Sequence, residues 1–505
     1  MTRLIKSVLT LALLLGLSGI RLQAQPDTAY HPMRQQSPVP ERMMLAPEVR
    51  AERQLQMLDH YRDLNRLQLY SYNLQRDQAL QEAFLSGDIL FGDTLSRYVA
   101  GIFARILAAN AELSPKNRVF LTRYTVPNAV NWNEYTTFLN MGLLSRLASE
   151  AEVAYVLCHE LAHQRLRHGL VQLQHQLHAQ QRLARDARSL VAGKSRREVR
   201  NSLPMLQYTL EQKALRALLE AYRHSREAEL QADSLGLALY RKTGYPAQAA
   251  ATALARLETC DADAYPTRLD LHVALSTDEY SWPHDPTAYR PPAAGPDKEA
   301  ALIDTLQQLG VPLTADSLAT HPAIPLRLQQ LNALLVGSVP DTTLSPVVDA
   351  RHAGIVRWAR YASAYTHYRH GDYGRSLYEV LQLARQQPGE PFLHALVVLN
   401  LMQLHHYCLL GTATYGRVVP APQAQYTDAY NRYLHSLRLS TASQLAQAAH
   451  GYALHYAALY PGAEQLHFAA AWAQAQHQRS TQPIQAFKEK FPYSPYNEFT
   501  PIFAP

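Results

Sequence analysis

The sequence predicts a mainly α-helical protein with one small β-sheet, followed by a second part that is entirely helical. Apolar residues recur every three to four positions over several long segments, which is the period of a helix face. Two short segments, residues 118–126 and 131–140, are instead rich in strand-forming residues. Of the 505 residues 47% are hydrophobic and 18% charged, so the chain is globular and too long for a single core.

The N-terminus is typical of an export signal. Two basic residues precede an apolar run from Val8 to Leu17, and Leu22-Gln23-Ala24 offers a small-residue cleavage site. The apolar run is shorter than a membrane-spanning helix, which favours cleavage over the alternative of an uncleaved anchor. We therefore expect a signal peptide at residues 1–24 and a linker at residues 25–45, where prolines recur.

The next part of the chain, residues 46–340, is expected to fold around the two strands. Apolar spacing predicts a helix within residues 47–84 and another at residues 95–113. The strand at residues 118–126 follows, and the strand at residues 131–140 leads into a further helix. This order places a helix directly after the second strand, and the residues that carry chemistry lie on that helix.

The most informative segment is His159-Glu160-Leu161-Ala162-His163, which ends an apolar, helix-forming run. Residues four apart share a helix face, so His159 and His163 can hold one ion, and Glu160 can reach a water bound to it. Two nitrogen ligands, a carboxylate base and an open coordination position suit a zinc hydrolase. The alternative is two solvated histidines and a solvated glutamate on an ordinary helix.

A third ligand is predicted further along the chain. Glu229 and Asp233 lie four apart on a predicted helix, and the small residues Ala232 and Gly236 would let it approach the first helix closely. Glu229 can supply a carboxylate oxygen to the metal, and Asp233 can accept the second ring N–H of a ligating histidine. On spacing alone, an acidic helix surface is an equally good interpretation, because other glutamates lie in the same interval.

The motif and the later acidic pair together resemble the signature of the HtpX/prenyl-protease family of gluzincins. The resemblance covers about residues 85–335 and implies that His159, His163 and Glu229 are zinc ligands, with Glu160 as the catalytic base and Asp233 as support for a ligand. Further segments match the family in the same order: Asn128-Ala129, Gly142-Leu143-Leu144, and Thr320-His321-Pro322 with Arg327.

The resemblance also bears on the second strand and on His321. It implies that the strand at residues 131–140 lies at a sheet edge, where an extended substrate adds to it through backbone pairing. An ordinary internal strand is the alternative. Pro322 favours a loop at His321, where that side chain would stabilise the oxyanion or fill the open zinc position. A cap on the following helix is an equally good interpretation of His321.

A long polar segment, residues 165–222, separates the two halves of the signature and is helical in pattern. It holds a basic cluster that two acidic residues interrupt and in which no aromatic residue is interleaved. This composition favours a solvated helix face, and contact with anionic lipid or a partner is the alternative. The cluster consists of Arg182, Arg185, Arg188, Lys194, Arg196, Arg197 and Arg200.

The last part of the chain has a different character. Residues 352–388 carry small, aromatic and turn residues near the positions of a tetratricopeptide unit, which needs neighbours to bury its faces. We predict a tetratricopeptide-like helical domain at residues 350–480 and a tail at residues 481–505. The combination resembles bacterial periplasmic proteases of outer-membrane protein assembly and quality control. The helices would then bind an envelope assembly partner or a substrate, and a plain stabilising bundle is the alternative.

These features together predict an exported zinc metalloendopeptidase with one Zn²⁺ per chain, which cleaves unfolded or misassembled envelope proteins. The formal charge of +6 does not imply nucleic-acid binding, and the mature chain holds no apolar run long enough to span a membrane. The bacterial periplasm is the expected location, with association to the outer membrane left open. The rival hypothesis is a zinc-stabilised chaperone or scaffold with latent peptidase activity, which acts through its helical repeats.

Overall fold

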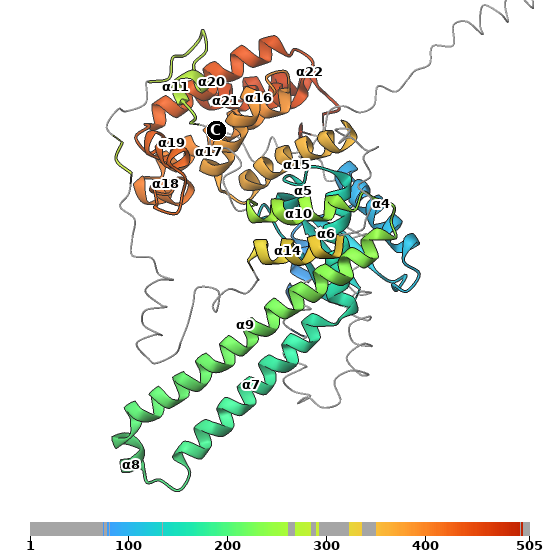
Figure 1. The fold of residues 1–505 in the computed structure, drawn as a ribbon. Helices are drawn as coiled ribbons and strands as arrows, with labels where there is room; N and C mark the ends of the chain where they lie inside the picture. The colour runs from blue at the N-terminus through green and yellow to red at the C-terminus, as the bar shows by residue number, and fades with distance from the viewer. Residues whose placement is uncertain are drawn as a thin grey trace, which may run out of the picture. The chain divides into compact units, whose positions relative to one another are not determined.

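The computed structural model of the chain confirms the mainly α class, with several helices around a small sheet (Figure 1). The predicted signal peptide, the predicted linker and His321 lie outside the described residues, so these predictions stay predictions. The structure describes residues 74, 78–79, 81–133, 135–260, 268–283, 289–291, 323–335, 350–494 and 496–497.

The sheet has four strands in the order β1-β2-β4-β3. Strand β4 runs parallel to β2 and antiparallel to β3, and β1 pairs antiparallel with the other side of β2. Phe84, Ile89, Phe120 and Phe138 form one buried cluster against the sheet. The strands are β1 (Ile89–Leu90), β2 (Arg118–Thr122), β3 (Ala129–Asn133) and β4 (Thr136–Asn140).

The prediction of one strand at residues 131–140 was wrong, because the chain reverses between Asn133 and Thr136 and forms a hairpin. Strand β4 is internal, with all but its last residue buried, and β3 is the edge strand. Asn131 and Asn133 are poor strand formers, and they lie at a register shift just before the chain reverses. The predicted strand at 118–126 also ends earlier, at Thr122.

Two helices cross beside the sheet and carry the predicted metal ligands. Helix α6 (Glu150–Arg165) begins at Ser149, whose side chain accepts a hydrogen bond from the Glu152 N–H. Most of α6 is buried, because it lies between the sheet and the second half of α9 (Leu203–Arg241). An ideal Cβ on Gly236 of α9 would lie 3.0 Å from the His159 Cα, so a larger residue there would require the two backbones to move apart.

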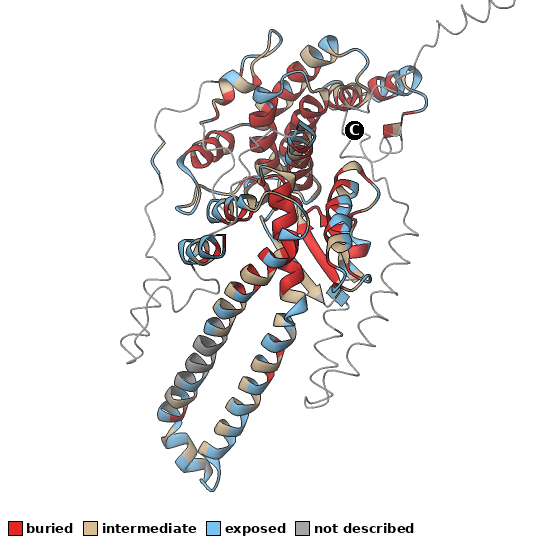
Figure 2. Cartoon of the chain, turned by 45° about the vertical axis from the view of Figure 1, so that its right-hand side comes forward, coloured by how far each residue is buried: buried red, intermediate tan, exposed pale blue. Residues whose placement is uncertain are grey.

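The segment between the two halves of the signature is a long helical hairpin. Arg167, in the left-handed conformation with φ of 57°, separates α6 from α7 (His168–Val191). The short helix α8 (Arg196–Asn201) follows, and α9 then returns along α7 (Figure 1). The residues described along the outer part of this hairpin are mostly exposed or half-buried (Figure 2).

The remaining helices of the first part pack around the sheet, α6 and α9, except α11, which lies beside the C-terminal helices (Figure 1). Asp93 caps α4 by accepting from the Ser96 N–H. Gln330 of α14 donates to the Leu230 carbonyl and to Ser234 Oγ, which docks α14 along α9. These helices are α4 (Thr94–Ala109), α5 (Met141–Leu144), α10 (Gln248–Glu258), α11 (Leu271–Leu275) and α14 (Ile324–Leu335).

The C-terminal part consists of helices only, and whether they are tetratricopeptide units stays a prediction. The pair α15–α16 matches the predicted helical hairpin at residues 352–388 in its approximate bounds. The helices are α15 (Ala350–Arg369), α16 (Tyr373–Gln386), α17 (Pro391–Leu409), α18 (Thr412–Val418), α19 (Asp428–Arg438), α20 (Ala442–Leu459), α21 (Glu464–Gln478) and α22 (Gln482–Lys490).

Helix α17 is long and apolar enough to cross a membrane by length and composition, the one such helix among the described residues. Its apolar stretch is 67% buried against neighbouring helices, above all α16, α20 and α21. A central helix of a helical layer has the same composition, because it is covered on most sides.

A buried histidine joins the two parts. His352 of α15 lies with Nδ1 2.7 Å from the Tyr98 hydroxyl of α4 and with Nε2 3.0 Å from the carbonyl oxygen of Leu147, just before α6. Only 1% of the surface of His352 is exposed, so its two ring nitrogens find their hydrogen-bond partners within the protein. The C-terminal helices are therefore attached to the segment that leads into α6.

We expect Gly236→Ala to destabilise the protein by about 1–3 kcal/mol, because the added methyl group must push α6 and α9 apart. Gly101→Ala in α4 is the matched control, since an ideal Cβ there meets nothing within 4 Å. The control should stabilise the helix by about 0.4–1 kcal/mol. Denaturant unfolding measures both changes, and equal effects of the two substitutions would contradict the close approach.

Candidate metal centre

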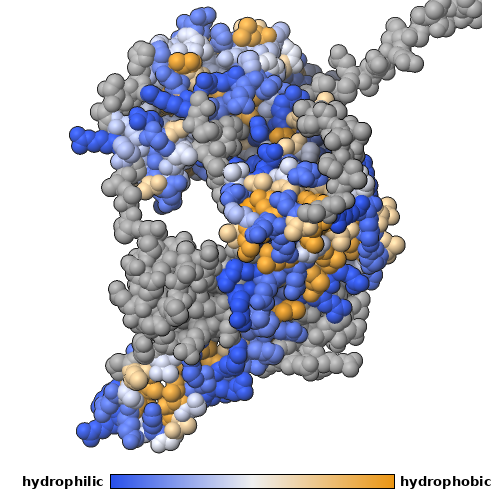
Figure 3. Space-filling model, in the orientation of Figure 1, coloured by the Kyte–Doolittle hydropathy of each residue, from blue (hydrophilic) through white to orange (hydrophobic). Residues whose placement is uncertain are grey.

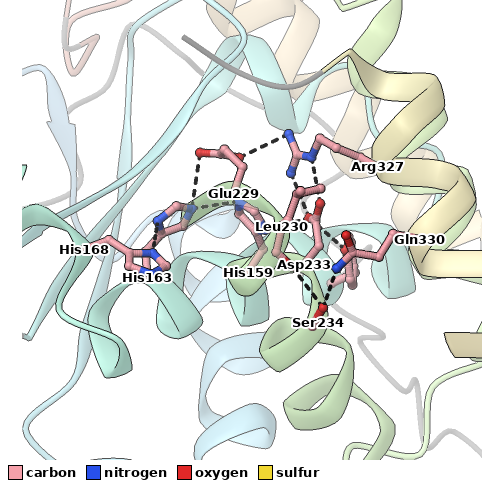
Figure 4. A network of polar contacts seen from close by, with 10 residues as sticks. His159, His163, His168, Glu229, Leu230, Asp233, Ser234, Arg327 and Gln330 are labelled. Carbon is pink, nitrogen blue, oxygen red and sulfur yellow. Dashed lines mark hydrogen bonds and ion pairs between the residues drawn. The ribbon is translucent and has the colours of Figure 1, made fainter. Parts of the chain in front are cut away.

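Helices α6 and α9 bring His159, His163 and Glu229 to one point (Figure 4). The two Nε2 atoms lie 3.0 Å apart, and the Glu229 carboxylate oxygens lie 3.5 Å from His159 Nε2 and 3.4 Å from His163 Nε2. Among the described residues this is the one group of three or more His, Cys, Asp or Glu side chains close enough to hold a metal ion.

The donor set and its spacing fit zinc. Zinc in hydrolases takes imidazole nitrogens and carboxylate oxygens at about 2.0–2.2 Å in a tetrahedral arrangement, which leaves neighbouring ligand atoms about 3.3–3.5 Å apart. The separations of 3.0, 3.4 and 3.5 Å between the three donors are close to those values. Three protein ligands also leave a fourth position open, as catalytic zinc sites require.

Asp233 and Arg327 contact the predicted metal ligands and support them. Asp233 Oδ1 lies 3.0 Å from His159 Nδ1, so the carboxylate can orient the ring whose Nε2 faces Glu229. Arg327 of α14 donates to both Asp233 oxygens, each at 2.7 Å, and its Nη1 lies 3.2 Å from Glu229 Oε2. The Tyr155 hydroxyl donates to Asp233 as well, at 3.2 Å. One buried arginine thus balances two buried carboxylates.

Ionisation within this cluster follows from its contacts. Burial opposes the charged form of Asp233, but the bonds from Arg327 and His159 outweigh it and lower the pKa of Asp233. Burial likewise opposes the charged form of His159, but Asp233 and Glu229 raise its pKa to about 10. Burial and the neighbouring His159 lower the pKa of His163 to about 3. A proton on His159 therefore competes with a metal ion for the site.

A contact that sequence reasoning missed supports the second imidazole. His168, the first residue of α7, lies with Nδ1 3.0 Å from His163 Nδ1, and its Nε2 lies 3.2 Å from Gln231 Oε1. If His163 binds metal through Nε2, its Nδ1–H donates to His168, which in turn donates to Gln231. Each histidine of the motif thus has its own partner, Asp233 for His159 and His168 for His163.

Glu160 points from α6 toward the edge strand. Its Oε2 accepts a hydrogen bond of 2.8 Å from the backbone N–H of Asn131 in β3. The side chain is buried, and burial is the main cause that raises the pKa of Glu160 to about 7. A carboxylate of this kind takes up and releases a proton near neutral pH, as a general base must.

A cleft of about 960 Å³ lies over these residues. The edge strand forms one wall with Ala129 to Asn131, and α7 and α9 form another with residues such as His175 and Ser225. The motif residues His159, Glu160 and His163 also line the cleft, together with Glu229 and Arg327. An extended chain can therefore reach the metal ligands, the base and the edge strand at once.

A helix pair that presents two histidines, a glutamate ligand and a carboxylate base to a cleft beside an edge strand defines the metallopeptidase class. Residues 95–335 match the model of peptidase family M48. The peptidase region of this chain therefore belongs to family M48, whose members depend on zinc. A comparison with curated proteins finds no match for the chain.

We expect Arg327→Met to destabilise the protein by about 3–5 kcal/mol, because Asp233 and Glu229 would remain buried without their cation. The matched control is Arg432→Met, which breaks an exposed pair with Asp428 on one helix and should leave stability unchanged within error. Denaturant unfolding at neutral pH compares the two variants. An Arg327→Met protein as stable as wild type would contradict the balancing role.

Proposed function

We propose that this protein is a zinc metalloendopeptidase with His159, His163 and Glu229 as zinc ligands and Glu160 as the general base. The convergence of these three donors within 4.8 Å of one another, beside a buried carboxylate of raised pKa, is the observation that carries the proposal. The family match supports the peptidase chemistry, and the donor set supports zinc.

The reaction follows from the positions of the side chains. Zinc, when bound, supplies a Lewis acid that activates water and polarises the scissile carbonyl. Glu160 accepts a proton from the attacking water and then returns it to the leaving amine nitrogen. Asp233 keeps His159 oriented and His168 keeps His163 oriented throughout, while Arg327 balances the charge of both carboxylates.

Among the described residues no strand pairs with the outer side of β3, and this edge suits an extended substrate. Asn128 and Val130 face β4, because the Asn140 N–H donates to the Asn128 carbonyl and Val130 is the partner of Phe138. Ala129 and Asn131 therefore present their backbone groups to the open side, where Glu160 already contacts the Asn131 N–H. A polypeptide that adds to this edge is recognised through its backbone, with little demand on its side chains.

This mode of recognition favours unfolded chains as substrates. A folded protein offers few extended segments with free backbone groups, whereas an unfolded or misassembled protein offers many. Together with the signal-like N-terminus, it supports an exported enzyme of the bacterial periplasm that removes misassembled envelope proteins. The C-terminal helices would bind an assembly partner or the substrate itself.

We expect Glu160→Gln to retain zinc and to lose peptidase activity by about 10²–10⁴-fold, because the amide keeps the shape of the side chain but cannot accept the proton. His163→Ala should lose the metal as well as the activity. Metal analysis of the purified proteins and cleavage of an unfolded protein measure the two properties separately.

Two outcomes of that experiment would contradict the proposal. A wild-type protein that binds zinc yet cleaves no unfolded chain would favour a zinc-stabilised chaperone or scaffold. A purified protein without zinc, and unable to take it up, would contradict both alternatives.

We expect Ala129→Pro to raise KM for an unfolded substrate about threefold to tenfold, because it removes one backbone N–H from the open side of β3. Val130→Pro is the comparison, since it removes an N–H that faces β4 and should lower the stability of the sheet instead. Steady-state kinetics and thermal unfolding of both variants separate binding from folding. An unchanged KM for Ala129→Pro would place the substrate elsewhere.

A further inference from the structure

Positive charge is concentrated at the far end of the α7–α9 hairpin. Residues 182–205, which we call the hairpin tip, contain seven basic and two acidic residues, a net charge of +5. The formal charge of the whole chain is +6, so the rest of the chain contributes only +1. Such a concentration in one short segment creates a local field that attracts anionic partners.

The two acidic residues of the hairpin tip already have partners. Asp186 pairs with Lys213 of α9 at 2.8 Å. Glu198 accepts from the N–H and the hydroxyl of Ser195, each at 2.7 Å, in the capping box of α8. Within the described residues no ion pair joins a carboxylate to five of the exposed cations of the tip. These are Arg185, Arg188, Lys194, Arg197 and Arg200.

Apolar side chains lie exposed among these cations. Val191 ends α7, and Leu203 and Met205 begin α9, on the two sides of the connection that contains α8. Their exposed fractions are 41%, 45% and 67%. Figure 3 shows apolar surface next to hydrophilic side chains at this end of the hairpin. Aliphatic side chains exposed among several cations are the pattern of a surface that lies at a lipid headgroup layer.

We propose that the hairpin tip docks on the surface of a lipid bilayer that carries anionic headgroups. Arg188, Arg197 and Arg200 would lie among the headgroups, and Leu203 and Met205 would enter the boundary of the acyl chains. Nucleic acid matches the charge but not the apolar residues, and the tip has no aromatic side chain on which bases could stack. The combination of cations and aliphatic side chains therefore favours lipid.

Apart from Arg182, which lines the cleft, the docking surface is separate from the peptidase site in the chain and in its chemistry. The tip contains none of the candidate metal ligands and none of their supporting residues. Membrane binding can therefore be measured on the Glu160→Gln protein, and its failure would leave the proposed peptidase function untouched.

The test uses the full chain and vesicles of two compositions. One contains equal parts of phosphatidylglycerol and phosphatidylcholine, and the other contains phosphatidylcholine only. We expect the wild type to co-sediment with the anionic vesicles and to be released by salt. Arg197→Glu/Arg200→Glu should raise the lipid concentration for half-maximal binding at least about tenfold. Leu203→Ser/Met205→Ser should weaken binding to the same vesicles by about tenfold.

Matched variants remove general effects of charge and hydropathy. Arg417→Glu/Lys488→Glu changes the net charge equally at exposed positions of the C-terminal helices, and Leu439→Ser/Leu459→Ser removes two exposed leucines there. Both should bind as wild type does. All proteins carry the same N-terminal segment, so any difference among them arises from the substituted surface, and circular dichroism checks that helix content is kept.

Three results would overturn the proposal. The first is equal binding of wild type to neutral and anionic vesicles. The second is unchanged binding by both tip variants. The third is a wild-type protein that binds heparin or DNA but no vesicles, which would assign the tip to a polyanion other than lipid.

Discussion

The contact between α6 and the second half of α9 is the constraint on which the peptidase region depends. Helix α6 contributes His159, Glu160 and His163, and α9 contributes Glu229 and Asp233, so no metal site exists unless these two helices lie at one fixed distance. Gly236 allows the backbones to approach, and Arg327 holds the carboxylates that the approach buries. Close packing and charge balance are thus two requirements of the same crossing.

Burial of so much charge is costly, and the structure shows how the cost is met. Asp233 accepts from Arg327, lies in contact with His159 and accepts from Tyr155, so its oxygens are well satisfied although the side chain is almost fully buried. Such a network favours one arrangement of its members over all others. The network therefore holds the His159 ring in one orientation, as pre-organised catalysis requires of a ligand.

The parts that sequence could predict are those fixed by local periodicity. Residues four apart on a helix must share a face, so the pairing of His159 with His163 and of Glu229 with Asp233 follows from spacing alone. The family resemblance then indicated that the two helices contribute ligands to one metal ion. The contact of His168 with His163 joins side chains on either side of the left-handed turn at Arg167, which helical spacing does not describe.

The hairpin of β3 and β4 is a part of the fold that sequence composition did not predict. Residues 131–140 have the composition of one strand, yet the reversal near Tyr135 makes β4 internal and leaves β3 at the edge. Strand composition does not distinguish one strand from two when the turn lacks glycine and proline, because the register is decided by pairing with β2. Only the structure therefore shows which of the two strands lies at the sheet edge.

Helix α9 is continuous over 39 residues, so its length fixes the distance between the hairpin tip and the metal ligands. At 1.5 Å per residue, Leu203 at its start stands about 39 Å along the axis from Glu229. If the start of the helix rests on a membrane and the helix stands upright, the metal site lies that far above the surface. A chain anchored in the same membrane then needs about a dozen extended residues to reach the metal, since each spans about 3.3 Å. The length of one helix would thus set the shortest tether that the enzyme can cut.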